Sequence, residues 1–396
     1  MRPVADARPI GPSHGRPRRA LWALCLTQIT SWGILYYAFP VVNPEITATT
    51  GWSTNTTTAA FTLALVVSAF SGIFVGRVID RRGPRAVMTS GSVLGGTSLV
   101  IIATAPSPAV FILGWFLAGP AMAATFYPPA FAALTRWWAP DHTRALTIVT
   151  LAGGLASTIF APLTAALNDW FGWRSTYLAL AVLLAAITVP AHAIALRAPW
   201  PPAPPPVPEY VDPTGIARTR TFAALVAALT LTNFAMYAVV VALVPLMLGR
   251  GFSLAAAALA LGLGGAGQTV GRLFYTLLAR LAGPRPRLVM LIASGAAATA
   301  ALAAIPGPYV LVVTLSVAAG MVRGNLTLAQ ATAVTDRWGA THYGRLSGLL
   351  AALPAAAGAL APFASAVLAT ALGGYPHLFM VLAVVAAIGA LAATRT

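Results

Sequence analysis

The sequence is poor in acidic residues and contains no lysine. Its 396 residues include 8 Asp and Glu residues and 24 basic residues, all of them arginine. Only 8% of the residues are charged and 58% are hydrophobic, whereas a soluble globular chain carries about 25% charged residues. This composition excludes an ordinary water-soluble domain. The net charge of +16 does not indicate a nucleic-acid partner, because the arginines lie in short stretches between apolar runs.

Residues for metal or catalytic chemistry are scarce as well. The one cysteine, Cys25, lies in an apolar run, which excludes disulfides within the chain and cysteine-based metal sites. The histidines, among them His142, His192 and His342, show no metal-ligand spacing. No nucleophile motif and no acid–base pair lies within the apolar runs. We therefore predict a protein that is not an enzyme and holds no metal and no cofactor.

Long apolar runs, by contrast, are abundant. Segments of about 18 or more apolar residues recur along the whole chain, and each can cross roughly 30 Å of hydrocarbon as an α-helix. Clusters of proline, glycine and arginine separate them. The pattern predicts an all-α membrane protein with twelve transmembrane helices, near residues 20–43, 55–79, 86–105, 108–135, 144–168, 174–196, 221–248, 253–279, 287–305, 308–335, 344–371 and 376–394.

A proline-rich segment divides the twelve predicted helices into two sets of six. Residues 197–220 contain Pro-Pro-Ala-Pro-Pro-Pro-Val-Pro, which favours a stiff, extended linker. The first apolar run follows an arginine-rich start without a convincing cleavage site, so we interpret it as a transmembrane helix. The predicted organisation is a cytoplasmic tail at 1–19, a six-helix bundle at 20–196, the linker at 197–220 and a second six-helix bundle at 221–396.

The arginines are distributed unevenly over the loops between the predicted helices. Loops on the side that holds the N-terminus carry 20 of the 24 arginines, whereas the opposite side carries Arg174 and Arg250. The remaining two, Arg272 and Arg323, lie inside predicted helices. Positive charge is retained on the cytoplasmic side of a membrane. The pattern predicts a multi-pass protein of the bacterial inner membrane with both termini and the linker in the cytoplasm.

Several sequence features recur at a spacing of 200 residues. Gly83-Pro84-Arg85 matches Gly283-Pro284-Arg285, and Trp138 matches Trp338. Two parallel halves related by an axis along the membrane normal are typical of one class of secondary transporter, with the substrate between the halves near the midplane. The repeat therefore predicts two pseudo-symmetric six-helix bundles and a transport function.

The segment Gly76-Arg77-Val78-Ile79-Asp80-Arg81-Arg82-Gly83-Pro84-Arg85 resembles the loop signature of the major facilitator superfamily in residue types, spacing and location. The resemblance implies gating roles for Gly76, Asp80, Arg81, Gly83 and Arg85. Asp80 at a helix end can accept hydrogen bonds from the N-terminus of another helix, while the arginines hold that face closed by charge-assisted contacts. The alternative is that these arginines only set the topology.

Within that superfamily, Tyr37-Ala38-Phe39-Pro40 and the loop around Asp80 resemble the branch of monocarboxylate and oxalate/formate porters. In that branch an Asp and an Arg four residues apart in the eighth helix serve substrate and proton, and the matching positions here are Gln268 and Arg272. A lysine often follows Tyr-Ala-Phe-Pro, but Val41 stands there in this chain. The resemblance therefore implies a retained anion ligand and the loss of two groups linked to proton coupling in some members.

Two arginines lie deep inside predicted helices. Arg272 precedes Gly283 by eleven residues and Arg323 precedes Arg337 by fourteen, which places them about 16 Å and about 21 Å along their helices. A charge at such depth is costly and faces the interior of the bundle. No acid lies in the middle of a predicted helix, and guanidinium groups bind carboxylates through paired hydrogen bonds. The alternative is that each arginine bonds helix carbonyls or Asn and Gln side chains.

Other polar side chains in the predicted helices are candidates for the lining of the same pocket. Tyrosines near helix ends are also common as interfacial anchors, so their position alone does not assign a role. Beside Arg272 and Arg323, the predicted substrate-binding residues are Tyr37, Tyr127, Asn233, Tyr237, Gln268 and Asn325.

The sequence thus predicts a monomeric carrier of small organic anions, mono- or dicarboxylates, that works by alternating access. Its partners are the anion and the lipid bilayer, and its coupling is either proton symport or anion exchange. An efflux carrier for drugs or metabolites with the same fold is the main alternative, although an antiporter for cationic drugs would need an acid inside a helix. A non-transporting membrane sensor is a more remote alternative.

Overall fold

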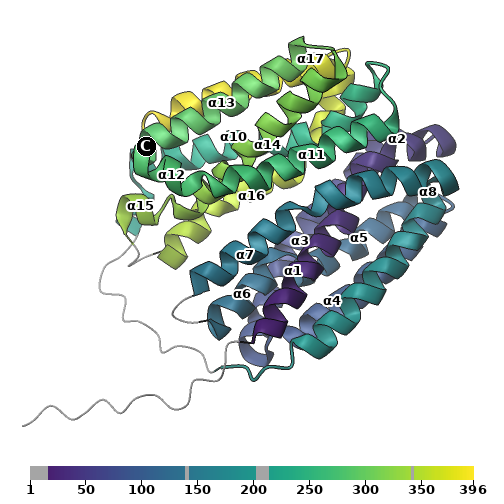
Figure 1. Cartoon of the computed structure of the whole chain (residues 1–396), viewed down its shortest axis with the longest axis horizontal. Helices are drawn as coiled ribbons and strands as arrows, with labels where there is room; N and C mark the ends of the chain where they lie inside the picture. The colour runs from purple at the N-terminus through teal and green to yellow at the C-terminus, as the bar shows by residue number, and fades with distance from the viewer. Residues whose placement is uncertain (1–16, 139–141, 202–213, 340–342) are drawn as a thin grey trace, which may run out of the picture.

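The computed structural model describes residues 17–138, 142–201, 214–339 and 343–396, and these are almost entirely helical (Figure 1). The first half consists of α1 (Arg18–Trp32), the π-helix η1 (Gly33–Tyr37), α2 (Ala38–Thr50), α3 (Thr54–Arg82), α4 (Pro84–Thr104), α5 (Pro108–Thr125), α6 (Tyr127–Trp137), α7 (His142–Gly154), α8 (Ala156–Pro190) and η2 (Ala191–Ala195). The second half consists of α9 (Thr214–Ala217), α10 (Arg220–Leu248), α11 (Leu254–Leu273), α12 (Tyr275–Leu281), α13 (Pro284–Ala304), α14 (Tyr309–Thr332), α15 (Thr335–Trp338), α16 (Tyr343–Ala371) and α17 (Tyr375–Ala393).

Twelve helical paths cross the bundle in the described part of the chain. Ten stretches are each long and apolar enough to span a membrane. One of them, Arg144–Ala195, turns at Gly172, where φ is +72°, and so contains two crossings. The path from α1 through η1 to α2 adds the first crossing. The prediction of an all-α membrane protein with twelve transmembrane helices is therefore confirmed.

The 200-residue repeat is visible in the helices themselves. α4 and α13 begin at Pro84 and Pro284, and each is 21 residues long. Proline suits the first turn of a helix because its missing N–H would have no helical partner there. Figure 1 shows the two halves as separate bundles that lie side by side, coloured purple to teal and green to yellow.

The first crossing is longer than predicted at both ends. α1 begins at Arg18, so Arg18 and Arg19 belong to the helix and not to the tail at 1–19. Pro44 predicts a stop near residue 43, but the helix continues to Thr50. It ends instead at Gly51, whose φ of +73° is the left-handed conformation that commonly terminates helices.

The start of the linker is anchored on the first half. The indole Nε1 of Trp200 donates to the backbone carbonyl of Asp80 at 3.2 Å, and the Arg136 guanidinium lies 4.6 Å from the centre of the Trp200 ring. The predicted extended linker at 197–220 also contains the short helix α9, while residues 202–213 lie outside the described residues. Trp200, near the start of the linker, therefore packs against the loop around Asp80, which was predicted to gate the carrier.

The two halves meet along a limited set of helices. α8 packs against α11, and α3 packs against α16. The hydroxyl of Thr158 donates to the Gly262 carbonyl at 2.9 Å, and the backbone N–H of Phe363 donates to the Thr62 hydroxyl at 3.1 Å. Thr62 lies twenty residues before the end of α3, far from the Asp80 loop.

We call the end of the bundle that carries the Asp80 loop and α15 the basic end. In Figure 1 the ribbons of the two halves diverge toward this end, where α15, α12 and the C-terminus lie. The hydrogen bonds described above join the halves at mid-depth and near the opposite end.

Candidate substrate-binding site

Glycines bring α11 and α14 into close contact. A Cβ atom at Gly320 would overlap the carbonyl oxygen of Gly264, and one at Gly324 would overlap the carbonyl oxygen of Gln268. Small residues allow such approach between membrane helices. The close packing places the side chains of Gln268 and Arg323 next to each other.

Arg323 is oriented by Gln268. Its Nε donates to Oε1 of Gln268 at 2.8 Å. Its Nη2 is buried and has no hydrogen-bond partner among the described residues. A buried donor without a partner is costly, so the Arg323 guanidinium is held in place while part of its binding capacity stays free.

Arg272 reaches across the boundary between the halves. Its Nη1 donates to the backbone carbonyl of Thr150 in α7, and a Cβ atom at Gly154 would lie 3.1 Å from the same nitrogen. Its Nε is buried without a partner in the described part of the chain. The side chain is 6% exposed. Arg272 thus joins the halves and still retains a donor for a ligand.

A π-helical turn places two tyrosines at the same cavity. Pro40 has no N–H and clashes with the carbonyl four residues earlier, so it disturbs the helix at Tyr36, and η1 covers Gly33–Tyr37 just before it. Both Tyr36 and Tyr37 line the cavity, although adjacent residues of a regular α-helix point about 100° apart. The Tyr36 hydroxyl is buried without a partner among the described residues.

A break between α5 and α6 presents Tyr127. Phe126 is extended, with φ −78° and ψ −166°, as is typical of the residue that caps the N-terminus of a helix. Gln28 donates from Nε2 to the carbonyls of Thr125 and Phe126 at 2.7 and 3.2 Å, which satisfies groups that the break would leave free. A Cβ atom at Gly153 would overlap the Tyr127 hydroxyl, so this glycine provides the room for the phenol.

These side chains surround one cavity of about 140 Å³ between the two halves, which we call the central cavity. Its lining combines two guanidinium groups, one amide and a group of aromatic rings, and it contains no Asp or Glu. The full lining is Trp32, Tyr36, Tyr37, Tyr127, Gly153, Met236, Tyr237, Val240, Gln268, Arg272, Arg323 and Thr327. Six of the eight predicted binding residues therefore lie together.

The other two predicted residues, Asn233 and Asn325, do not line the central cavity. Asn233 donates from Nδ2 to Oε1 of Gln330 at 3.2 Å, between α10 and α14. Asn325 donates to the Met321 carbonyl of its own helix at 3.0 Å. It follows Arg323 by two residues, about 200° around a helix, and so faces away from the central cavity.

Several lining residues were not predicted. Trp32 precedes Tyr36 by four residues, and Thr327 follows Arg323 by four. Trp32 therefore shares a helix face with Tyr36, and Thr327 shares one with Arg323. That spacing was a usable signal. Met236 and Gly153 carry no such signal, because an apolar or small residue in a membrane helix is most often a packing residue.

The predicted gating residues form contacts within the first half. Arg85 donates from Nε to the Ala193 carbonyl at 2.8 Å. Arg136 donates to the backbone carbonyl of Asp80 at 3.0 Å, while the Asp80 side chain is exposed. Gly83 adopts φ +79° at the end of α3. Gly76 has open space around it, and Arg81 is exposed.

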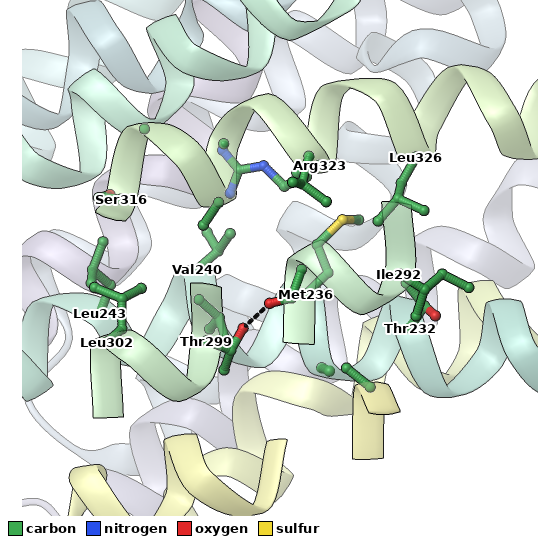
Figure 2. A pocket seen from close by; sticks show the side chains of 18 of the residues that line it. Thr232, Met236, Val240, Leu243, Ile292, Thr299, Leu302, Ser316, Arg323 and Leu326 are labelled. Carbon is green, nitrogen blue, oxygen red and sulfur yellow. Dashed lines mark hydrogen bonds between the residues drawn. The ribbon is translucent and has the colours of Figure 1, made fainter. Parts of the chain in front are cut away.

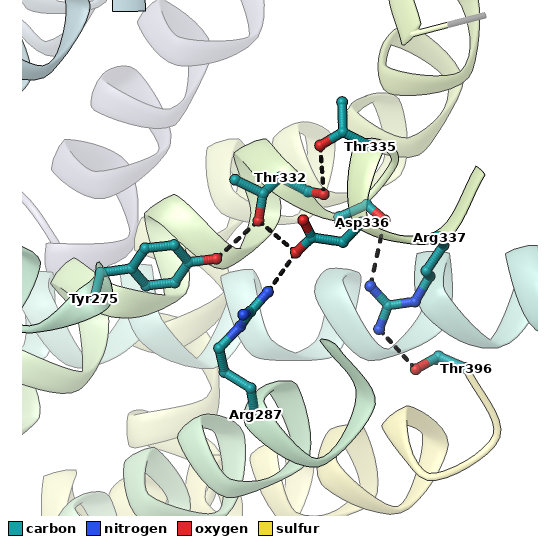
Figure 3. A network of polar contacts seen from close by, with 8 residues as sticks. Tyr275, Arg287, Thr332, Thr335, Asp336, Arg337 and Thr396 are labelled. Atoms are coloured by element: carbon teal, nitrogen blue, oxygen red, sulfur yellow. Dashed lines mark hydrogen bonds and ion pairs between the residues drawn. The ribbon is translucent and has the colours of Figure 1, made fainter. Parts of the chain in front are cut away.

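At the same end, the second half has an ion pair between a buried arginine and a partly exposed aspartate (Figure 3). Arg287, which is 5% exposed, pairs with Asp336. The Asp336 carboxylate also accepts from the Thr332 hydroxyl at 2.9 Å, and the Thr332 hydroxyl lies 2.8 Å from that of Tyr275. Asp336 follows Arg136 by 200 residues, so this position of the repeat is positively charged in the first half and negatively charged in the second.

The same cluster holds the C-terminal residue. Arg337 donates to the Thr396 hydroxyl at 3.1 Å and to the Ala333 carbonyl at 3.3 Å. Burial lowers the pKa of Arg337, while the neighbouring Asp336 raises it. The cluster therefore ties α13, α14, α15 and the end of the chain together at the basic end.

Two repeated helical halves with a cationic, aromatic cavity between them define a membrane carrier. Residues 24–362 match the sequence profile of the Major Facilitator Superfamily. The chain belongs to the major facilitator superfamily, and it is a transporter and not an enzyme.

The chain is also similar to individual curated proteins and to solved structures. Monocarboxylate transporter 13 of Rattus norvegicus is 25% identical over 370 residues, which cover 91% of this chain and 82% of that protein. An uncharacterized 38 kDa protein in the 23S RNA operon of Thermoproteus tenax is 30% identical over 175 residues, which cover 44% of this chain and 46% of that protein. A solved structure of a bacterial homologue of the human lysosomal transporter Spinster, inward-facing and unoccupied, has a TM-score of 0.73 over 97% of this chain and 95% of that chain, at 16% identity. This last likeness supports the fold alone.

Proposed function

We propose that this transporter moves small organic anions, mono- or dicarboxylates, across the bacterial inner membrane by alternating access. The observation that carries the proposal is the pair of guanidinium groups of Arg272 and Arg323, which face one cavity between the halves. Each keeps a buried donor that no described residue satisfies.

The charge of the cavity favours an anion. One buried and one half-buried positive charge without a carboxylate in the lining are costly, and an anion that enters relieves this cost. A carboxylate matches the parallel N–H groups of guanidinium and forms charge-assisted hydrogen bonds, which are stronger than neutral ones. The name of the rat relative, monocarboxylate transporter 13, agrees with this substrate class.

The arrangement of the halves supports a mechanism. Arg272 contacts Thr150 of the other half directly, so a ligand bound at Arg272 changes the interactions at the boundary. A ligand shifts a conformational equilibrium by its difference in affinity between the states. We infer that the anion lowers the free energy of the occluded state, because it neutralises charge that closure would bury further.

Orientation and coupling complete the proposal. The arginine-rich basic end faces the cytoplasm, with both termini there, by the positive-inside rule. The transporter acts as a monomer within the lipid bilayer. With no Asp or Glu in the lining, its coupling is either symport with a proton carried by the substrate or an unassigned group, or exchange of one anion for another.

Uptake into proteoliposomes tests this function. Purified protein is reconstituted and supplied with radiolabelled lactate, pyruvate or oxalate, with and without a pH gradient, and with protein-free liposomes as the control. We expect saturable uptake of at least one acid above the control. Stimulation by an inward proton gradient would support symport, and stimulation by an internal anion would support exchange. Absence of uptake of every acid by folded protein would contradict the proposal.

A further inference from the structure

A second cavity lies inside the second half, between α10, α11, α13, α14 and α17 (Figure 2). It measures about 60 Å³, and we call it the side cavity. Its walls are mainly aliphatic side chains such as Leu243, Ile292 and Leu326. It therefore offers an apolar volume within a single bundle.

The side cavity adjoins the central cavity. Arg323, Met236 and Val240 line both. In Figure 2 the Arg323 guanidinium lies beside Val240, at the edge of the side cavity. On the other side its Nε bonds Gln268, a residue of the central cavity. A ligand whose charged group meets Arg323 thus has an apolar compartment next to that group.

The polar groups of the side cavity are already satisfied. The hydroxyls of Thr232, Thr299 and Ser316 donate to helix carbonyls at 2.7, 2.8 and 2.9 Å. Apart from the guanidinium of Arg323, the side chains of this lining therefore leave no free donor for a second polar group of a ligand. A second carboxylate placed there would be buried without a partner, which is unfavourable.

We propose that the side cavity binds the aliphatic tail of the transported acid, whose carboxylate is held by Arg323 and Arg272. This inference rests on the proposed function and makes it narrower, because it selects short-chain aliphatic monocarboxylates over dicarboxylates. A cavity needs about 10–15 Å³ by this measure to hold one water, so about 60 Å³ accommodates roughly four carbon atoms. Each buried methylene increases affinity about fourfold.

Equilibrium binding of acetate, butyrate and hexanoate to the protein in nanodiscs, by calorimetry at neutral pH, tests the inference. We expect affinity to rise from acetate to butyrate by about sixteenfold, since two more methylenes enter the side cavity. Thr299→Leu fills the side cavity and should remove this increase while acetate still binds. Among the described residues, the Thr299 hydroxyl bonds the Gly295 carbonyl of its own helix and no other helix.

Two further variants complete the test. Thr314→Leu is the matched control, because Thr314 bonds its own helix in the same way but is exposed; it should bind all three acids as the wild type does. Leu243→Ala enlarges the side cavity and should shift the preference toward hexanoate, which tests the inference even if Thr299→Leu fails to fold.

The outcomes separate the inference from the function on which it rests. If acetate binds and the affinity of wild-type protein does not depend on chain length, the side cavity does not hold the tail, although the anion site stands. The same conclusion follows if Thr299→Leu keeps the wild-type dependence on chain length. Where Thr299→Leu does not fold, an unchanged dependence in Leu243→Ala leads to this conclusion. If folded wild-type protein binds none of the acids, both the inference and the anion site are wrong.

Discussion

Arg323 donates from Nε to Oε1 of Gln268 at 2.8 Å, across the contact between α14 and α11. Through this bond a neutral amide, that of Gln268, orients the Arg323 guanidinium. A carboxylate at residue 268 would neutralise the charge of Arg323, whereas the amide leaves that charge available. We interpret the pair as the reason that a cationic site persists in the middle of an apolar bundle.

Gln268→Glu should therefore weaken anion binding. The new carboxylate would compete with the substrate for Arg323 and repel it, and at about 4 Å such repulsion is worth several kcal/mol even in a screened protein environment. We expect at least a tenfold loss of affinity at neutral pH, measured by calorimetry with butyrate. The control is Asn325→Asp, which adds the same charge outside the central cavity. Equal affinity for the wild type and Gln268→Glu would show that Arg323 does not contact the anion.

Gly320→Ala should destabilise the second half. The added methyl group would overlap the Gly264 carbonyl oxygen and push α14 away from α11, and overpacking of this kind costs about 1–3 kcal/mol. The thermal unfolding temperature in detergent should fall, and anion affinity should fall with it. Gly72→Ala is the matched control, because Gly72 also lies within a helix but has nothing within 4 Å of its Cβ position. A normal unfolding temperature for Gly320→Ala would contradict the close contact.

The two acids at the basic end should respond differently to loss of charge. Asp336→Asn leaves the buried Arg287 guanidinium without its charged partner, and a buried donor left unsatisfied costs about 1–3 kcal/mol. Asp80→Asn should change the unfolding free energy by less than about 0.5 kcal/mol, as exposed substitutions do. Thermal unfolding of both variants checks this prediction. Similar stability losses for the two would be inconsistent with the exposed Asp80 side chain.

The fold could be predicted because membrane spans have a strong signal. Runs of apolar residues set the crossings, and the repeat of Pro84 at Pro284 identified the two halves. The boundaries were less certain, because Pro44 interrupts the sequence pattern without ending the helix. Tertiary contacts decide whether a proline ends a membrane helix, and the local sequence does not show them.

The site could be predicted only in part, for a related reason. Arg272 and Arg323 were identified by the cost of burying charge, which depends on residue type and depth alone. The positions of Asn233 and Asn325 depend on which helix face meets a neighbour, and both amides bond within the second half. The π-turn at η1 also changes the faces that Tyr36 and Tyr37 present, and no regular helical period predicts that change.

The most direct test of the anion site is binding of butyrate to Arg272→Gln and Arg323→Gln, measured by calorimetry on folded protein, with Arg218→Gln as the control for loss of an exposed arginine. Hydrogen bonds to charged groups contribute about 1.5–3 kcal/mol, so each of the two variants should bind at least tenfold more weakly, while Arg218→Gln should bind as the wild type does. Wild-type affinity in both Arg272→Gln and Arg323→Gln would contradict a carboxylate site at these two arginines.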